Sequence, residues 1–551
     1  MKTIAIIPAR GGSKGIPRKN LRPMAGMPLI FYSIKACLDS KEVDYTVVST
    51  DDDEIALFAQ RFGAEVLIRD SELANDSATL DPVIAHAVDV YEKKGSIAID
   101  IVLTIQPTSP LVTSQDIDDA LGQLISTKSD TIISSVEDKH LCWKKNEIGK
   151  IIPDYSKRVN RQQLPDKFKE TGAIIACRRE VLNTDSRIGD KVSLYIMDHD
   201  RSHDIDNLSD FYLCESLLKR KRIAFVVKGN KEIGLGHAYR SVMLANELVR
   251  NEIQFFLSDE DHLAAEYIKK YNYPISIKVQ KDLLKTILAW QPDLVINDIL
   301  DTDLGYISAL KNSNIKIVNF EDLGEGIKHA DLVVNALYPT ALPYSHVVND
   351  YGYFCLRDEF LHPPKKENTE DVKKVILCFG GVDEGNLTFN SLKAIGLYCK
   401  DKGIAITVIL GMGYSYQHDL DQLMNESDLL SNIDIIKSTS RISDYMAQAD
   451  LAITSGGRTV FELSAMKVPT IVICQNQREL THKFATSEIG VINLGHRIDV
   501  SEHQIYTVFV SAVENKDMRK LMLEKASTLD LTKGKRKVIS MIEALMEDSN
   551  V

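Results

Sequence analysis

The chain has 551 residues, of which 44% are hydrophobic and 26% charged. This balance is typical of globular proteins, and the length allows roughly three or four compact units of about 150 residues each. The formal net charge of −12 argues against a nucleic-acid-binding protein, because such a protein needs a basic face for the phosphate backbone. The eight cysteines are scattered singly with no CxxC spacing, so we expect reduced core residues rather than disulfides or zinc ligands.

The start of the chain is one lysine followed by the strand-like run TIAIIPA. It contains neither a long apolar stretch nor a small-residue cleavage site, so no signal peptide and no membrane insertion are predicted. We therefore expect a cytoplasmic protein.

Short β-branched runs alternate with helical patterns over the first 220 residues. Strands are expected at 2–9, 45–50, 100–106, 131–136, 171–177 and 192–197, and helices at 28–40 and 81–94. This alternation predicts an α/β domain with a mostly parallel sheet covered by helices.

The α/β pattern restarts twice further along the chain. A charged helix end near Arg222 precedes a new apolar strand, 223–227, and a Pro-rich, charged stretch at 362–374 precedes another strand. Such a stretch is typical of a linker. We therefore predict three α/β lobes, at 1–221, 222–362 and 363–551.

The first strand leads directly into IPARGGSKGIPRKN, residues 7–20. Glycines after a strand expose backbone N–H groups that suit oxygen anions, and a local basic loop in an acidic chain favours a small anionic ligand. The stretch fits neither the Walker A sequence nor the GxGxxG fingerprint. A basic, solvated turn is the alternative. The positive charge available to a triphosphate comes from Arg10, Lys14, Arg18 and Lys19.

Six segments then follow in order: IPARGGSKGIPRKNL, VVSTDDDEI, RDSELANDSAT, LTIQPTSPL, NRQQLP and HDIDNLSDF. Together they resemble the motifs of cytidylyltransferases that activate sialic acids and related nonulosonic acids to their CMP forms. The resemblance covers residues 1 to about 220 and implies a Rossmann-like nucleotidyltransferase domain. It also implies the reaction, in which the anomeric hydroxyl of an α-keto acid sugar attacks the α-phosphorus of CTP and pyrophosphate leaves.

The resemblance further implies the residues that bind each substrate. Those expected around CTP are Arg10, Gly11, Gly12, Ser13, Lys14, Lys19, Asn20, Arg69 and Ser77. Those expected around the sugar are Gln106, Arg161 and Gln162, although Gln106 and Arg161 would also fit as side chains that fix loops. Departures from the family pattern at Val112, Thr171 and Ile175 leave the identity of the sugar open.

Asp204 and Asp206 in the HDID motif are two residues apart. In an extended segment their carboxylates project to one face and can share a hard cation, for which we expect Mg²⁺. An isolated D-x-D is more often a solvated turn, but the family motif favours the metal. The proton acceptor stays open between one of these aspartates and a magnesium-bound hydroxide.

The segment Lys139–Pro165 interrupts the alternation of strands and helices. The family resemblance suggests that such a segment is an exchanged arm. We therefore expect a homodimer formed through the N-terminal domain.

The second half opens with IGLGHAYRSVMLANEL, which places His237 after a glycine turn at the start of a helix. The positive helix end favours a neutral imidazole, which suits a general base, although a capping histidine is the alternative. Further motifs at 294–300, 318–324, 353–360, 377–387, 453–469 and 473–482 join this one. In this order they resemble the UDP-sugar hydrolase of the pseudaminic acid pathway, which has the two-lobed GT-B fold.

That resemblance implies a UDP-sugar site between two lobes. Glycines and hydroxyls of SGGRTVFE would bind the diphosphate, and Glu462 would accept from the ribose. Phe461 stands where the family usually carries a polar residue, so the donor contact stays open. The full set of expected contacts is Gly236, Arg240, Asp298, Gly380, Gly381, Ser455, Gly456, Gly457, Thr459, Glu462 and Asn476.

Three functions remain compatible with these patterns. The first is a bifunctional enzyme that hydrolyses a UDP-linked diacetamido-trideoxyhexose and activates a pseudaminic or legionaminic type of acid with CTP. The second replaces hydrolysis by glycosyl transfer, because one fold serves both. The third makes the second half a nucleotide-sensing module without catalysis.

Overall fold

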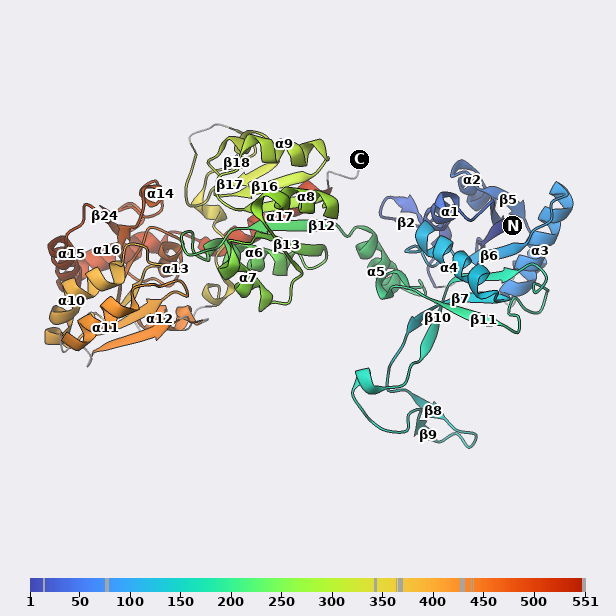
Figure 1. Cartoon of the computed structure of the whole chain (residues 1–551), viewed down its shortest axis with the longest axis horizontal. Coiled ribbons are helices and arrows are strands. Elements are labelled where there is room, and N and C mark those ends of the chain that lie inside the picture. The colour runs from blue at the N-terminus through green and yellow to red at the C-terminus, as the bar shows by residue number, and fades with distance from the viewer. Residues whose placement is uncertain are drawn as a thin grey trace. The chain divides into compact units, whose positions relative to one another are not determined.

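The computed structural model describes residues 1–547 except 13–14, 75–78, 341–343, 363, 365–369, 427–431, 438 and 440. The chain divides into two compact units, Met1–Arg220 and Lys221–Val551, which we call unit 1 and unit 2 (Figure 1). Both are mixed α/β structures with largely parallel sheets, which confirms the expected fold class.

Unit 1 is built on one sheet of seven strands. Its strands are β1 (Thr3–Pro8), β4 (Tyr45–Thr50), β5 (Glu65–Ile68), β6 (Ile101–Ile105), β7 (Thr131–Glu137), β10 (Phe168–Arg178) and β11 (Val192–Ile196). Its helices are α1 (Leu29–Asp39), α2 (Asp53–Arg61), α3 (Leu80–Gly95), α4 (Ser114–Thr127) and α5 (Leu208–Leu218). The short elements are β2 (Pro23–Met24), β3 (Met27–Pro28), η1 (Lys19–Leu21), η2 (Ser71–Leu73), η3 (Arg161–Gln163) and η4 (His199–Arg201).

The strand order in this sheet is β11-β7-β10-β6-β1-β4-β5. β1 pairs in parallel with both β4 and β6, and these strands are almost entirely buried because helices cover both faces. β10 instead runs antiparallel to β6 and β7, with a register shift between Glu170 and Ile175. β10 begins at Phe168, three residues before the strand expected at 171–177. The irregularity at Gly172 therefore lies inside this longer strand.

The segment Lys139–Pro165 forms a hairpin arm that stands away from the sheet of unit 1 (Figure 1). β8 (Trp143–Lys145) pairs with β9 (Ile151–Pro153) in a separate two-stranded sheet. Its apolar side chains are exposed, with 57% of Trp143 and 84% of Ile148 accessible to solvent. An arm with such side chains has little core of its own.

Unit 2 contains two further parallel sheets, of seven and six strands, which define its first and second lobes. The first has the order β14-β13-β12-β15-β16-β17-β18. Its strands are β12 (Arg222–Val227), β13 (Glu252–Ser258), β14 (Ile275–Lys278), β15 (Leu294–Asp298), β16 (Lys316–Phe320), β17 (Leu332–Val334) and β18 (Val347–Val348). Its helices are α6 (Gly236–Glu247), α7 (His262–Lys269), α8 (Gln280–Trp290), α9 (Leu304–Asn312), η5 (Glu325–Lys328), η6 (Tyr351–Tyr353) and η7 (Asp358–Phe360).

The second lobe has the strand order β21-β20-β19-β22-β23-β24. Its strands are β19 (Lys374–Cys378), β20 (Ala405–Leu410), β21 (Ile433–Lys437), β22 (Leu451–Thr454), β23 (Thr470–Cys474) and β24 (Val491–His496). Its helices are α10 (Leu387–Lys402), α11 (Gln417–Glu426), α12 (Ile442–Gln448), α13 (Thr459–Ala465), α14 (Gln477–Leu480), α15 (Glu502–Glu514), α16 (Lys516–Ser527) and η8 (Leu531–Lys533).

The last helix, α17 (Gly534–Glu547), packs on the first lobe. Val538, Ile542 and Met546 recur at a spacing of four residues, so they share one helix face, and they belong to the same buried cluster as Phe225 and Phe255 of the first sheet. The lobe boundaries predicted from the sequence assign 534–547 to the lobe at 363–551. In the structure, this helix instead completes the core of the first lobe.

All eight cysteines are free, and seven of them are buried, as their scattered spacing predicts. Among the described residues, no helix combines the length and the apolar character that crossing a membrane requires.

Candidate active sites

The Gly-rich loop follows β1, and Ser13 and Lys14 of it lie outside the described residues, as does Ser77. A Cβ on Gly11 would lie 2.5 Å from Asp52 Oδ2, so only glycine fits there. Its N–H donates to Asp51 Oδ1 at 3.1 Å, and Arg69 Nη2 lies 3.7 Å from the same carboxylate oxygen. After the end of β1, the expected Gly11 and Arg69 therefore both lie beside the carboxylate of Asp51.

The same loop contacts the HDID segment. Lys19 Nζ donates to the carbonyl of Ile205 at 2.7 Å, and a Cβ on Gly15 would lie 2.8 Å from the carbonyl of Asp206. Asn20 Nδ2 fixes the loop by donating to the carbonyl of Arg10 at 2.9 Å. Gly12 has open space around its Cα, so a ligand can approach the backbone there. The fold thus brings together two motifs almost 190 residues apart.

Asp204 is the most unusual group of this site. Its Oδ1 is buried with no hydrogen-bond partner in the described part of the chain, whereas Asp206 is exposed. Burial raises the pKa of Asp204, and the charge of Asp206 adds to this effect. Burial lowers the pKa of Lys19, while the charges of the two aspartates oppose that shift. The three groups therefore influence one another directly.

The residues expected around the sugar are more scattered. A Cβ on Gly172, whose φ is +73°, would lie 3.1 Å from Gln106 Nε2, so this glycine makes room for the amide. Arg161 and Gln162 lie on η3 with exposed side chains, and neither bonds to the Gly-rich loop within the described residues. The three departures from the family pattern are buried core positions, namely Val112, Thr171 and Ile175.

In unit 2, a cavity of about 340 Å³ is lined by residues of both lobes. Ten of the expected UDP-sugar and catalytic residues line it: Gly236, His237, Arg240, Gly380, Gly381, Ser455, Gly457, Thr459, Glu462 and Asn476. Asp298 and Gly456 do not. Gly380 has a φ of +81°, a backbone conformation that favours glycine.

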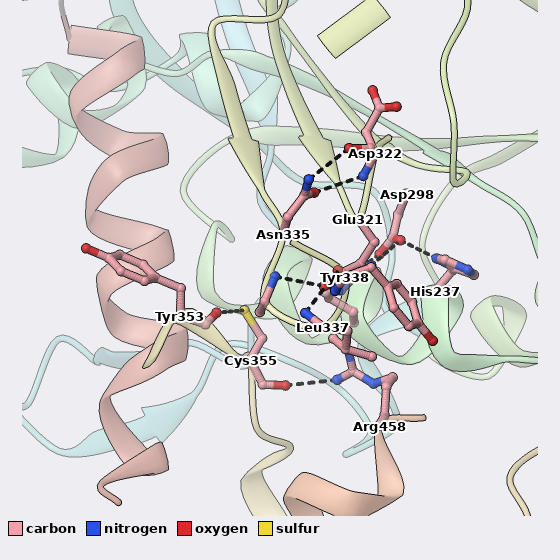
Figure 2. Close-up of polar contacts among 12 residues, drawn as sticks. His237, Asp298, Glu321, Asp322, Asn335, Leu337, Tyr338, Tyr353, Cys355 and Arg458 are labelled. Atoms are coloured by element: carbon pink, nitrogen blue, oxygen red, sulfur yellow. Dashed lines mark hydrogen bonds and ion pairs between the residues drawn. The ribbon is translucent and has the colours of Figure 1, made fainter. Parts of the chain in front are cut away.

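His237 is the second residue of α6, and Asp298, the last residue of β15, lies directly beside it (Figure 2). Its Nδ1 bonds to Asp298 Oδ1, and Arg240 donates to both oxygens of the same carboxylate at 2.6 and 2.7 Å. Arg240 Nη1 also donates to Glu321 at 3.0 Å. Burial raises the pKa of Asp298, but the charges of Arg240 and His237 outweigh burial and hold it at about 2.

This arrangement changes the expected role of Asp298. The side chain is fully buried and both of its oxygens are occupied, so it orients His237 instead of meeting a sugar. Arg240 lines the cavity, yet its guanidinium is held by Asp298 and Glu321. Glu321 is itself fixed by backbone N–H groups, among them those of Leu337 and Tyr338 (Figure 2).

The expected diphosphate cradle is also partly occupied by the protein. Glu479 Oε2 accepts from the N–H of Gly456 at 3.0 Å and of Gln475 at 2.7 Å. Glu462 Oε1 accepts from Arg357 Nε at 2.9 Å. Burial raises the pKa of Glu479 to about 7, against the effect of its two backbone hydrogen bonds.

Two other residues of this region have structural tasks. Asn476 caps α14 by accepting from the N–H of Glu479 at 3.1 Å. Phe461, which replaces a polar residue of the family pattern, stacks on Phe354 and Phe484 at 3.9 and 4.0 Å between ring centroids. Its ring is therefore part of the core of the second lobe and does not face the cavity.

The sequence interpretation missed several charged residues that line the cavity. Among them are Glu321, Arg357, Arg458, Arg478 and Glu479. All five lie inside motifs of the sequence analysis, at 318–324, 353–360, 453–469 and 473–482. A signal was therefore present for each of them, as a charged residue within a motif expected to face the nucleotide.

Comparison with known proteins assigns the class. Residues 4–228 match the cytidylyltransferase family model, and residues 375–487 match the glycosyltransferase family 28 C-terminal domain. Over its first part the chain belongs to the cytidylyltransferase family, since it is 30% identical to the pseudaminic acid cytidylyltransferase of Campylobacter jejuni serotype O:2. That alignment covers 40% of this chain and 97% of the relative.

Two further similarities include residues outside unit 1. An uncharacterised protein of Methanocaldococcus jannaschii is 30% identical over 305 residues, which are 51% of this chain; the chain spans 62% of that relative's length. A solved structure of MurG from Acinetobacter baumannii is 13% identical, with a TM-score of 0.45, and the match covers 59% of this chain and 99% of MurG.

Proposed function

We propose that unit 1 transfers CMP from CTP to a nonulosonic acid. The observation that carries this proposal is the meeting of the Gly-rich loop, Lys19 and the Asp204–Asp206 pair at one end of the sheet. Membership of the cytidylyltransferase family supports it, as does the similarity to the pseudaminic acid cytidylyltransferase of Campylobacter jejuni. The cytoplasm is the compartment in which we place the reaction.

In this reaction the anomeric hydroxyl oxygen of the sugar forms a bond to the α-phosphorus of CTP. The bond from that phosphorus to the bridging oxygen breaks, and pyrophosphate leaves with the electron pair. Lys19 and Arg10 would offset charge on the phosphates, and the open backbone at Gly12 would donate to their oxygens. Asp206 is exposed and would accept the hydroxyl proton.

The residues present fit a magnesium ion. Asp204 Oδ1 is buried without a hydrogen-bond partner among the described residues, so it is free there to ligate a cation. Magnesium is usually held by one or two carboxylates together with substrate phosphates and water, so Asp204 and Asp206 suffice even though the described residues contain no group of three candidate ligands. When bound, the ion would neutralise charge on the triphosphate.

A pyrophosphate-release assay tests this proposal. Release should require a nonulosonic acid and CTP, with ATP a poor substitute, because the family motif surrounds a cytidine nucleotide. Comparable rates with CTP and ATP would contradict the proposed substrate.

We propose further that unit 2 hydrolyses a UDP-sugar. The observation behind it is that His237, which bonds to the buried Asp298, lines the same cavity as residues of the SGGRTVFE turn. Since Asp298 is ionised, it accepts a hydrogen bond from Nδ1–H, which leaves the Nε2 lone pair of a neutral imidazole to accept a proton.

The proposed chemistry uses that lone pair. Water oxygen forms a bond to the anomeric carbon, its proton passes to His237 Nε2, and the bond from carbon to the β-phosphate oxygen breaks as UDP leaves. A diacetamido-trideoxyhexose is the sugar we propose, and its hydrolysis would precede formation of the acid that unit 1 uses.

Glycosyl transfer is a second candidate, favoured by the match of residues 375–487 to a glycosyltransferase domain. A sugar hydroxyl would then replace water. Incubating the full chain with a panel of UDP-diacetamido-hexoses decides between them: UDP release without acceptor supports hydrolysis, and release only with an acceptor supports transfer. Binding of UDP without any turnover would indicate a sensing module.

A further inference from the structure

Four arginines line the cavity of unit 2, and three of them are neutralised within the protein. The ion pairs are Arg240 with Asp298, Arg357 with Glu462, and Arg478 with Asp301. Within the described residues, Arg458 is the exception, because no carboxylate lies within 4.0 Å of its guanidinium. Arg458 is therefore a positive charge of the cavity wall that forms no ion pair with a described carboxylate, although the charges of Glu462 and Asp298 act on it from a greater distance.

Neutral groups hold the guanidinium of Arg458 in place. Nη2 donates to the carbonyl of Cys355 at 2.9 Å, a contact drawn in Figure 2, and the guanidinium carbon lies 4.7 Å from the ring centroid of Phe354. Nη1 is buried and has no hydrogen-bond partner in the part of the chain that the structure describes. One edge of the guanidinium is thus left without a described hydrogen-bond acceptor. Burying such a group costs free energy unless a ligand supplies the acceptor.

The surroundings of Arg458 also destabilise its charged form. Burial and the nearby charge of Arg240 lower the pKa of Arg458 to about 10, against the charges of Glu462 and Asp298, so the group is still protonated at neutral pH. The positive charges of Arg240 and Arg458 repel each other at low dielectric. An anion beside Arg458 would relieve both the burial and this repulsion.

The position of Arg458 relates it to the proposed base. A Cβ on Gly236 would lie 3.0 Å from Arg458 Cδ, so the arginine stem lies against the residue that precedes His237. Arg458 comes from the second lobe, directly before α13, while Gly236 begins α6 of the first lobe. An anionic group at Arg458 is therefore at the end of the cavity where His237 lies.

We propose that Arg458 binds an oxygen of the β-phosphate of a nucleoside diphosphate in this cavity. Guanidinium groups form strong, charge-assisted hydrogen bonds with phosphate oxygens. Negative charge grows on the β-phosphate as its bond to the sugar breaks, so this contact is stronger during bond breaking than before it. This inference rests on the proposed function of unit 2, since it assumes a nucleoside diphosphate ligand.

Calorimetric titration of the full chain with UDP and UMP tests the assignment, because the two ligands differ only in the β-phosphate. We expect Arg458→Gln to weaken UDP binding by about 10- to 100-fold, the effect of losing a buried charge-assisted hydrogen bond, and to leave UMP binding unchanged. Arg458→Lys keeps the charge but not the fork, so its UDP affinity should fall between the two.

Arg478→Gln is the matched control, because Arg478 lines the same cavity but is paired with Asp301. Its ratio of UDP to UMP affinity should equal that of the wild type. An equal loss for UDP and UMP in Arg458→Gln, or no loss for UDP, overturns the assignment of Arg458 alone. If the wild type binds neither nucleotide, the proposed function of unit 2 fails as well.

Circular dichroism checks that Arg458→Gln is folded. If it is not, Arg458→Lys decides: a selective loss of UDP affinity supports the proposal, and an unchanged ratio of the two affinities overturns it.

Discussion

The two candidate sites differ in how much of their charge is already paired. In the described part of unit 1, Asp204 Oδ1 is buried without a hydrogen-bond partner, and Lys19 donates to a carbonyl and not to a carboxylate. In unit 2, both oxygens of Asp298 are occupied, and the histidine beside it is already oriented. Preorganised groups act without rearrangement when the ligand arrives, whereas unpaired ones await it. We therefore expect the first site to depend on an added cation and the second to be assembled beforehand.

The largest effect expected is that of His237→Ala on UDP release. General-base catalysis contributes about 10²- to 10⁴-fold, so turnover should fall by that order. The affinity for UDP should hardly change, since the imidazole acts on water. Initial rates and calorimetric titration of the same preparation measure the two effects; a normal rate would remove His237 from the mechanism.

Asp204→Ala should lower pyrophosphate release by about a hundredfold, because a carboxylate proposed to hold the cation on the triphosphate is lost. A chelator should act similarly on the wild type. UDP release by the same samples should not change, since its expected base is oriented by Asp298 and Arg240. If the chelator abolished both activities, the expectation that only the site of unit 1 depends on a cation would be contradicted.

Asp298→Asn separates orientation from catalysis in unit 2. The amide can donate to Nδ1 and thereby fix the wrong tautomer, so we expect a loss of turnover of roughly tenfold to a hundredfold. Initial rates of UDP release at fixed pH measure this loss, with calorimetric titration of UDP as the control for binding. A turnover equal to that of the wild type would limit Asp298 to a packing role.

These outcomes separate what the sequence can predict from what it cannot. Parallel strands, the Gly-rich turns and His237 are local patterns, and the structure contains them near the expected positions. Asp298 is at the predicted strand end, but its pairing with Arg240 depends on how α6 packs on β15, and no local pattern expresses that. That Arg458 is the cavity arginine without an ion pair among the described residues likewise becomes visible only in the structure, where the other three arginines are paired.

A smaller effect concerns the stability of the second lobe. Glu479 has a pKa of about 7 in the folded chain, above its ordinary 4.5, so its contribution is complete below pH 4.5 and is lost as the pH rises to about 7. The loss is on the order of 3 kcal/mol. Glu479→Gln cannot ionise, so its melting temperature relative to wild type should rise between pH 5 and pH 8; a constant difference would contradict this.

The smallest effect on either activity is expected from the hairpin arm of unit 1. We propose that its exposed Trp143 and Ile148 bury themselves in a homodimer. Trp143→Lys should shift the mass measured by light scattering toward the monomer, with Lys144→Gln on the same strand as a control. A wild type that is monomeric at micromolar concentration would rule this dimer out.

The packing of α17 on the first lobe has a consequence for the order of synthesis. Val538, Ile542 and Met546 fill the core around Phe225, which the ribosome makes more than 300 residues earlier. The second lobe lies between them in the chain, so it can become compact before its neighbour is complete. The first lobe should therefore stay exposed to proteases and chaperones until translation has passed residue 546.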